Sequence, residues 1–298
     1  MSRRAARLAC ALILLAVPLT NGPAANAAFP GTNGEIAFSR FGHHQTDIWV
    51  VHPGVTGTNR LTNTQQQREA FPDYDATGTK IAFSRCGLGE LSNCEIWTMD
   101  SDGTNKLRLT FTPGVQETWP AWSPDGTKIA YTSDASGSSQ DVWVMDADGN
   151  NQTQLTTFVG FDAFPEWSPN GARIAFTSNR MAADDIWTMD PTGASLKRLT
   201  AGPGIDERPD YSPDGTRIVF SRNGNIWRMN ASGLNEVRLT SSKDDEFAPA
   251  YAPTGGRIVF NRATNDGKIG VWTMKADGSN RVRRTFAIED FFPDWQPV

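Results

Sequence analysis

The feature that most constrains the fold is a motif that recurs six times: a carboxylate three residues before a proline that opens a short strand. Successive copies lie 40 to 48 residues apart and extend over almost the whole chain. A regular spacing of this length indicates one structural unit repeated in space, and not a single core wrapped by unrelated segments. The carboxylates are Glu69, Glu117, Asp162, Asp206, Glu246 and Asp290, and the prolines are Pro72, Pro120, Pro165, Pro209, Pro249 and Pro293.

Two further series of residues keep the phase of this motif. The first is a tryptophan preceded directly by Ile or Val, and the second is a glycine that follows a turn and precedes an apolar run. Each series has six members, so the sequence predicts six copies of one unit. The tryptophans are Trp49, Trp97, Trp143, Trp187, Trp227 and Trp272, and the glycines are Gly34, Gly78, Gly126, Gly171, Gly215 and Gly255.

A central unit shows what each copy is expected to form. Its Ser-Pro-Asp-Gly sequence at 123–126 supplies a preset φ at proline and tolerance of positive φ at glycine, and a second turn at 146–149 again ends on glycine. Short runs between such turns predict an antiparallel meander of four strands. The expected strands span 119–123, 128–133, 141–146 and 152–156.

The middle strands of the units are apolar on both faces, as in 129–131 and 142–145. A sheet of this kind has to be covered on both sides. Closing six radial sheets into a ring covers every face, which predicts an all-β, six-bladed β-propeller of four-stranded antiparallel blades over residues 28–298. The first unit lacks its opening strand, so we expect the C-terminal segment 292–295 to join blade 1 and close the ring.

An aromatic residue stands two positions after each of the six prolines. Their regular phase predicts a core between blades rather than a carbohydrate-stacking surface. Trp119 is different, because the other units have Phe, Arg or Ala at its position, and it is a candidate anchor at the mouth of the central channel. The phased aromatic residues are Tyr74, Trp122, Trp167, Tyr211, Tyr251 and Trp295.

The first 27 residues have the pattern of a secretory signal peptide. Three arginines precede an apolar run at 8–19, and small residues at 25–27 predict cleavage before Ala28. That run is shorter than the roughly 20 apolar residues a membrane span requires, and no other segment approaches this length. We therefore expect an exported protein, periplasmic or extracellular, without a transmembrane segment.

Charge and cysteine usage narrow the possible partners and the compartment. Removing residues 1–27, which hold three arginines and no acids, changes the formal net charge from −5 to about −8. Nucleic acid is a poor partner for such a surface. Cys86 and Cys94 are the only cysteines left, and in an exported protein they are expected to form a disulfide, with two free thiols as the alternative.

The phased motifs resemble the TolB-type, WD40-like propeller repeat. Its pattern of Pro-x-aromatic-Ser-Pro-Asp-Gly, followed by an apolar strand and an Ile-Trp-x-Met-Asp strand, is closely matched at 122–126 and 167–171 and degraded at 75–78 and 252–255. The resemblance covers nearly all of the mature chain and implies the propeller fold. It does not imply one activity, because similar propellers serve as partner-binding modules, as domains that gate peptidases and as lyases.

The sequence offers no catalytic constellation. Serine hydrolysis in an α/β-hydrolase uses a Gly-x-Ser-x-Gly turn, which is absent. The three histidines, His43, His44 and His52, all fall in the first unit, so they cannot form a site drawn from several blades like that of histidine-dependent manganese lyases. We assign no catalytic residue and no cofactor.

Chain direction places the six carboxylates at the top of the predicted ring, the face where the innermost strands begin and where loop lengths vary most. Six like charges around the channel mouth would repel one another. Bound calcium, a cationic group of a ligand or partner, or internal pairing could compensate them. Internal pairing has candidate partners in Arg40, Arg85, Arg222 and Arg262, at or near the ends of the second strands.

From these observations we predict a monomeric, non-enzymatic propeller that binds a protein or peptide across its acidic top face. The predicted ligand-binding residues at the channel mouth are Trp119 and the six carboxylates. The alternative is a cell-envelope carbohydrate-binding protein, or a lyase or hydrolase, that uses those carboxylates as acids, bases or calcium ligands.

Overall fold

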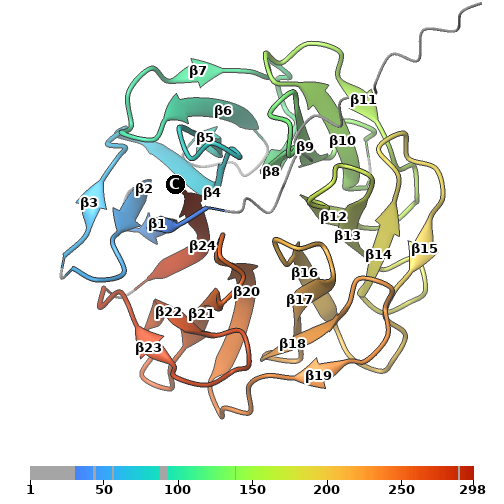
Figure 1. Cartoon of the computed structure of the whole chain (residues 1–298). Coiled ribbons are helices and arrows are strands. Elements are labelled where there is room, and N and C mark those ends of the chain that lie inside the picture. Colours follow the sequence, from blue (N-terminus) through green and yellow to red (C-terminus); the bar gives the residue numbers. More distant parts are fainter. Residues whose placement is uncertain (1–30, 43–44, 56, 88–92, 138, 288) are drawn as a thin grey trace, which may run out of the picture.

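The computed structural model describes residues 31–298, except for 43–44, 56, 88–92, 138 and 288. The predicted signal peptide, His43 and His44 therefore lie outside the described residues. Within the described part all regular structure is β-strand, and no helix long and apolar enough to cross a membrane occurs there. The strands form four-stranded antiparallel blades arranged around a central axis, as predicted (Figure 1).

Each blade is a meander in which the first strand lies nearest the central axis and the short fourth strand lies at the rim. Blade 1 contains β24 (Asp290–Pro297), β1 (Asn33–Phe41), β2 (Thr46–Val51) and β3 (Asn59–Arg60). Blade 2 contains β4 (Gln67–Tyr74), β5 (Lys80–Gly87), β6 (Cys94–Asp100) and β7 (Leu107–Arg108). Blade 3 contains β8 (Glu117–Trp122), β9 (Lys128–Ser133), β10 (Asp141–Asp146) and β11 (Thr153–Gln154).

The other three blades repeat this order. Blade 4 contains β12 (Asp162–Trp167), β13 (Ile174–Ser178), β14 (Asp185–Met189) and β15 (Lys197–Arg198). Blade 5 contains β16 (Asp206–Tyr211), β17 (Arg217–Arg222), β18 (Asn225–Asn230) and β19 (Val237–Arg238). Blade 6 contains β20 (Asp245–Tyr251), β21 (Arg257–Ala263), β22 (Ile269–Lys275) and β23 (Val282–Arg283).

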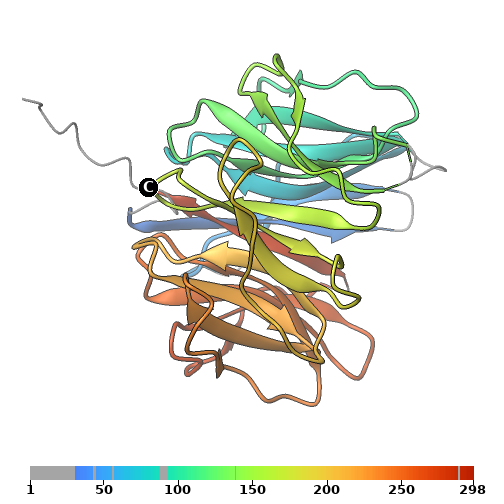
Figure 2. The ribbon, with the colours of Figure 1, turned by 90° about the vertical axis from the view of Figure 1, so that its right-hand side faces the viewer.

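The two ends of the described chain together build blade 1. β24 pairs antiparallel with β1, so that Ile36 faces Trp295 and Arg40 faces Asp290. The backbone N–H of Thr32 donates to the carbonyl of Val298 at 2.7 Å, which extends the ladder to the chain end. The C-terminal strand thus completes the ring, and the side view shows β24 and β1 lying together within the disc (Figure 2).

The hydrophobic core is divided into layers between neighbouring blades. Between blades 2 and 3, Ile96 of β6 packs with Trp122 of β8 and Tyr131 of β9, all at most 5% exposed. All six phased aromatic residues are buried, which fits the predicted core between blades. Because each layer uses one face of two sheets, every middle strand needs apolar residues on both of its faces.

The Ser-Pro-Asp-Gly turns end the innermost strands through local hydrogen bonds. In blade 3, the Ser123 hydroxyl donates to Asp125 Oδ1 at 2.7 Å and accepts from the backbone N–H of Lys128 at 2.9 Å. Gly126 has φ of +68°, a conformation that glycine adopts without a Cβ penalty. The motif therefore fixes where the second strand of the blade begins.

The predicted disulfide between Cys86 and Cys94 is confirmed. The two residues lie directly opposite each other in the pairing of β5 with β6, with their Cα atoms 4.0 Å apart. The bond joins the second and third strands of blade 2 at the top end.

Candidate functional site

Each innermost strand has a register shift just before its phased proline, as in β4, β8 and β12. Proline cannot donate a ladder hydrogen bond, and a β-bulge accommodates it while turning the preceding side chain to a different face. The preceding residue has positive φ in all six strands and projects toward the central channel. These residues are Phe71 (60°), Trp119 (55°), Phe164 (55°), Arg208 (56°), Ala248 (47°) and Phe292 (54°).

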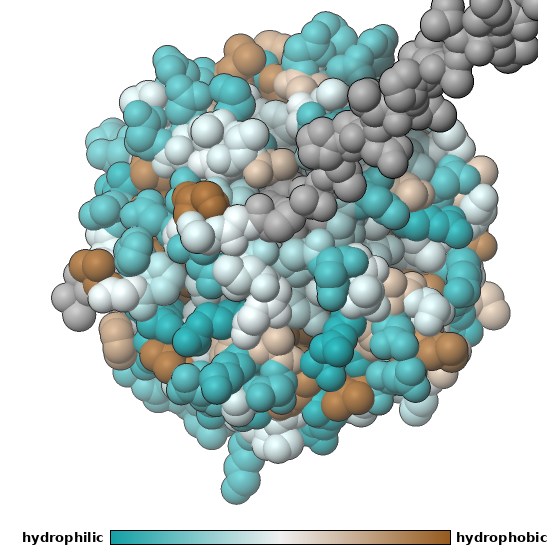
Figure 3. Space-filling model, in the orientation of Figure 1, coloured by the Kyte–Doolittle hydropathy of each residue, from teal (hydrophilic) through white to brown (hydrophobic). Residues whose placement is uncertain are grey.

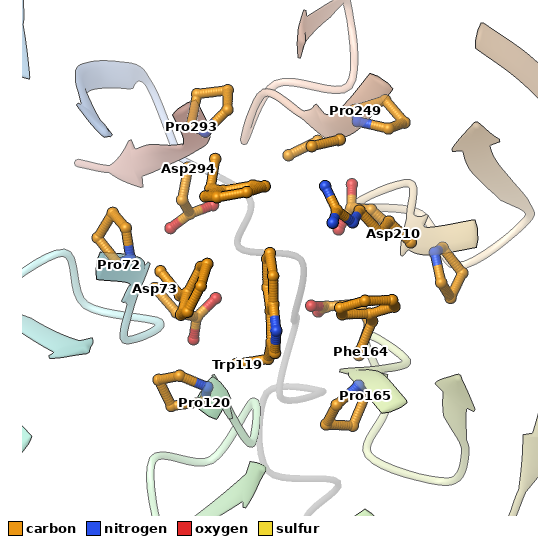
Figure 4. A pocket seen from close by; sticks show the side chains of 17 residues that line it. Pro72, Asp73, Trp119, Pro120, Phe164, Pro165, Asp210, Pro249, Pro293 and Asp294 are labelled. Carbon is orange, nitrogen blue, oxygen red and sulfur yellow. The ribbon is translucent and has the colours of Figure 1, made fainter. Parts of the chain in front are cut away.

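The aromatic members of this ring meet around Trp119 (Figure 4). The indole stacks on Phe71 with the ring centroids 3.8 Å apart. It makes edge-to-face contacts with Phe164 and Phe292, each at 4.6 Å between centroids. We call Phe71, Trp119, Phe164 and Phe292 the aromatic cluster. It lines a cavity of about 110 Å³, and each of its members keeps partial exposure.

Arg208 lines the same cavity from the fifth blade. Its guanidinium carbon lies 4.7 Å from the Trp119 ring centroid and 4.8 Å from those of Phe164 and Phe292. Burial lowers the pKa of Arg208 to about 10, while Glu207 favours the charged form. The cation therefore remains protonated at neutral pH and lies against ring faces.

A second set of side chains follows the phased prolines and was missed in the sequence. Asp73, Glu166, Asp210 and Asp294 line the same cavity as the aromatic cluster and also surround a smaller cavity of about 30 Å³. The sequence does contain a signal for these side chains, because the residue directly after the phased proline is acidic in four of the six units. In the other two units this residue is alanine.

Three of these four carboxylates also connect neighbouring blades. Asp294 accepts a hydrogen bond from the backbone N–H of Tyr74 at 2.7 Å, and Asp73 accepts one from Trp122 at the same distance. Asp210 accepts one from Tyr251. Desolvation raises the pKa of all four, that of Asp294 to about 7. Mutual repulsion adds to this effect for Asp73, Glu166 and Asp210, so the neutral forms of these carboxyl groups are favoured.

The six carboxylates predicted at the channel mouth occupy a different position. Each is at most 1% exposed, and none belongs to the lining of the channel cavity. Four arginines predicted as candidate partners lie beside them: Arg40 Nη2 is 3.1 Å from Asp290, Arg85 Nε is 2.7 Å from Glu69, Arg222 Nη2 is 2.7 Å from Asp206, and Arg262 is 3.6 Å from Glu246. This geometry favours internal pairing, and ligand binding by these six carboxylates stays a prediction.

Blade 4 has the same kind of ion pair, but its arginine does not stand at the position that the repeat predicts. Asp162 faces Ser178 in the strand register, but Arg180, two residues further along, donates to Asp162 at 2.6 Å. Blade 6 is looser, because Arg262 directs its close contact, at 2.7 Å, to Asp244.

Blade 3 has no arginine at the corresponding place. Glu117 faces Ser133, and its carboxyl accepts side-chain hydrogen bonds from Thr110 and Thr112 instead. Its Oε2 atom is buried without a hydrogen-bond partner. Burial raises the pKa of Glu117 to about 7.

The described residues contain no group of three His, Cys, Asp or Glu side chains that could hold a metal ion. His52 lies in a different cavity, between blades 1 and 6. The possible calcium site therefore gains no ligand set from the described part, and it stays untested.

The sequence matches a family model described as the TolB β-propeller domain, over residues 21–158 and 139–298. The chain belongs to this family. Comparison with curated proteins found no match. The family membership agrees with the repeat resemblance and the six blades, and it leaves ligand and partner open.

Solved structures show the same fold. TolB from Acinetobacter baumannii aligns with a TM-score of 0.76 at 20% identity, covering 89% of this chain and 67% of that one. A putative TolB from Agrobacterium tumefaciens aligns at 0.68 and 22% identity, covering 89% and 92%. A chain from a nidogen/laminin complex aligns at 0.72 and 12% identity, covering 88% and 98%. Identities this low show a common fold alone.

Proposed function

We propose that this protein is an exported, non-enzymatic scaffold that binds a protein or peptide segment at the top of its channel. The observation that carries the proposal is the aromatic cluster. Four partly exposed rings, held on inner strands of three blades and on the closing strand, converge on one small cavity. Aromatic side chains on a rigid frame supply contact area at low cost in conformational entropy, and they are enriched among residues that dominate binding energy.

The distribution of surface residues supports the top face as the binding face. The opposite face, which carries the C-terminus, is largely hydrophilic, and its hydrophobic residues are scattered (Figure 3). At the top, Asp245 and Glu289 are exposed at or just before the starts of innermost strands. They supply the acidic character that the buried carboxylates lose by pairing.

Export is part of the proposal and has two supports. The pattern of residues 1–27 is that of a signal peptide. The disulfide between Cys86 and Cys94 suits an oxidising compartment. N-terminal sequencing of protein secreted by an expressing bacterium would test the predicted cleavage before Ala28.

Selection from a displayed peptide library tests the binding site. Peptides enriched on the wild-type protein are expected to lose about tenfold or more in affinity for Trp119→Ala, since truncating a central aromatic anchor typically costs about 2 kcal/mol. Phe111→Ala is the matched control, because Phe111 is 67% exposed in the connection between blades 2 and 3 and lies outside the channel. Equal binding by both variants would refute the site.

The alternative of a glycan-binding protein, lyase or hydrolase rests on the protonatable carboxyl groups. Turnover of a glycan library that is abolished by Glu117→Gln would favour it over the scaffold. No turnover, with peptide binding intact, would support the scaffold.

A further inference from the structure

Arg208 is a partly buried cation that forms no ion pair within the described part of the chain. Among the residues that the structure describes, its guanidinium makes no hydrogen bond and no ion pair, and its Nε atom is buried without a partner. Its own backbone N–H is satisfied by Thr177 at 3.0 Å, so the strand position is fixed while the side chain is unpaired. A buried N–H donor of a charged group costs free energy when it has no hydrogen-bond partner. A ligand that accepts this hydrogen bond would remove the cost.

Other arginines of this protein show what such a group binds here. Five arginines lie near or just after the end of the second strand of their blade. Each lies over the phased tryptophan of that blade and also contacts a carboxylate. Arg40, for example, is 4.5 Å from the Trp49 ring centroid and contacts Asp290 through both Nε and Nη2. The others are Arg85, Arg180, Arg222 and Arg262, at 3.9, 4.8, 4.9 and 4.9 Å from their tryptophans.

Arg208 has the first half of this arrangement without the second. Three rings of the aromatic cluster lie within 4.8 Å of its guanidinium carbon, but no carboxylate contacts it. Glu207, its neighbour in sequence, attracts it electrostatically and forms no ion pair. Asp210 lines the same cavity, but its carboxyl group accepts a hydrogen bond from the backbone N–H of Tyr251.

The cavity beside Arg208 limits the size of the missing group. Its volume of about 110 Å³ admits a few non-hydrogen atoms. The planar fork of guanidinium N–H groups matches a carboxylate in two parallel hydrogen bonds. The walls combine aromatic rings with the carboxyl groups of Asp73, Glu166, Asp210 and Asp294. Burial raises the pKa of all four carboxyl groups, which favours their neutral forms beside a bound carboxylate.

We propose that Arg208 is the anchor of a carboxylate-binding subsite within the channel cavity. The carboxylate comes from an acidic side chain or the C-terminus of a bound peptide, or from a small organic acid. Binding of a peptide carboxylate rests on the proposed function, whereas binding of a small organic acid does not. The subsite places a negatively charged group of the ligand at the centre of a top face whose outer charges are acidic.

The decisive experiment follows the Nε–H resonance of Arg208 in protein labelled with ¹⁵N-arginine. Loss of the resonance in Arg208→Lys assigns it. Titration with sodium acetate, at ionic strength held constant with sodium chloride, is expected to give a saturable shift with Kd on the order of 1 mM for so small a ligand. Acetamide, which has the same shape and no charge, is expected to give no saturable shift. A resonance that does not move with up to about 100 mM acetate, roughly 100 times the expected Kd, overturns the proposal.

Two variants with the same loss of charge provide a second readout. Acetate is expected to raise the thermal midpoint of the wild type and of Arg68→Gln, but not of Arg208→Gln. Arg68 is exposed on the innermost strand of blade 2 and does not line the cavity. An equal rise in both variants would overturn the assignment to Arg208. The wild-type titration stands alone if Arg208→Gln does not fold.

Three blocked peptides identify the source of the carboxylate. Acetyl-Gly-Glu-Gly-amide presents a side-chain acid, acetyl-Gly-Gly-Gly with a free C-terminus presents a main-chain acid, and acetyl-Gly-Gln-Gly-amide presents neither. A saturable shift with either acid and none with the Gln peptide supports a peptide ligand. A shift with acetate alone supports a small organic acid, and it leaves the subsite standing even if peptide selection fails.

Discussion

Glu117 lies directly opposite Ser133 in the pairing of β8 with β9, and no arginine reaches its buried carboxyl. In each of the other five blades an arginine lies within 3.6 Å of the corresponding acid. Glu117 is therefore the one member of the series, within the described part of the chain, that has to be satisfied by hydroxyl groups. The same strand carries Trp119, the centre of the aromatic cluster.

Glu117→Gln is expected to stabilise the protein at pH 8. The pKa of Glu117 rises from 4.5 to about 7 on folding, so the folded state holds more protons between these values. Its contribution is fully present below pH 4.5 and is lost as pH rises through about 7. The amide does not ionise, so the variant should gain about 1 to 3 kcal/mol over the wild type at pH 8 and little at pH 5.

Urea unfolding of both proteins at the two pH values measures this difference. Glu69→Gln is the control, because it breaks the pair with Arg85 and should destabilise at both pH values. A Glu117→Gln protein less stable than wild type at pH 8 would contradict the assignment.

Arg180→Met is expected to cost about 3 kcal/mol of unfolding free energy, because it leaves the carboxylate of Asp162 buried without a counter-ion. The double variant Arg180→Met/Asp162→Asn should recover much of this loss, since no charge remains buried. Arg173→Met in the same blade, whose guanidinium contacts a surface carbonyl, should change stability by less than about 0.5 kcal/mol. Denaturant unfolding of the four proteins provides the comparison, and additive single effects would argue against the pair.

Removing the disulfide by Cys86→Ala/Cys94→Ala is expected to destabilise the protein by about 2 kcal/mol, because the eight-residue separation closes only a short loop. Calorimetry with and without dithiothreitol measures the effect. Reductant should lower the thermal midpoint of the wild type to that of the double variant and leave the variant unchanged. A reductant-sensitive variant would show that the loss has another cause.

Deleting residues 290–298 should abolish cooperative unfolding, because β1 then loses the partner that completes blade 1. A synthetic peptide of residues 290–298 is expected to restore a cooperative transition in proportion to its concentration. A peptide of scrambled sequence is the control. Unchanged cooperative unfolding without any peptide would show that β24 does not close the ring.

The sequence was sufficient to predict the number of blades, the closing strand and the disulfide. These features depend on phase and on chain order, and both can be counted along the chain. The buried aromatic residues followed from the same periodicity, because a residue that recurs in phase occupies the same place in every sheet. Arg180 escaped prediction, since it reaches Asp162 from two residues beyond the strand register.

The sequence alone thus determined the architecture, through repeated turns and apolar runs that admit one closed arrangement. Only the tertiary structure decided which acids face the channel and which lie behind its wall. The bulge before each phased proline turns side chains such as Trp119 and Arg208 inward, against simple strand alternation. Charge compensation is likewise a property of distance in space, so the pairing of Arg40 with Asp290, 250 residues apart, required the closed ring.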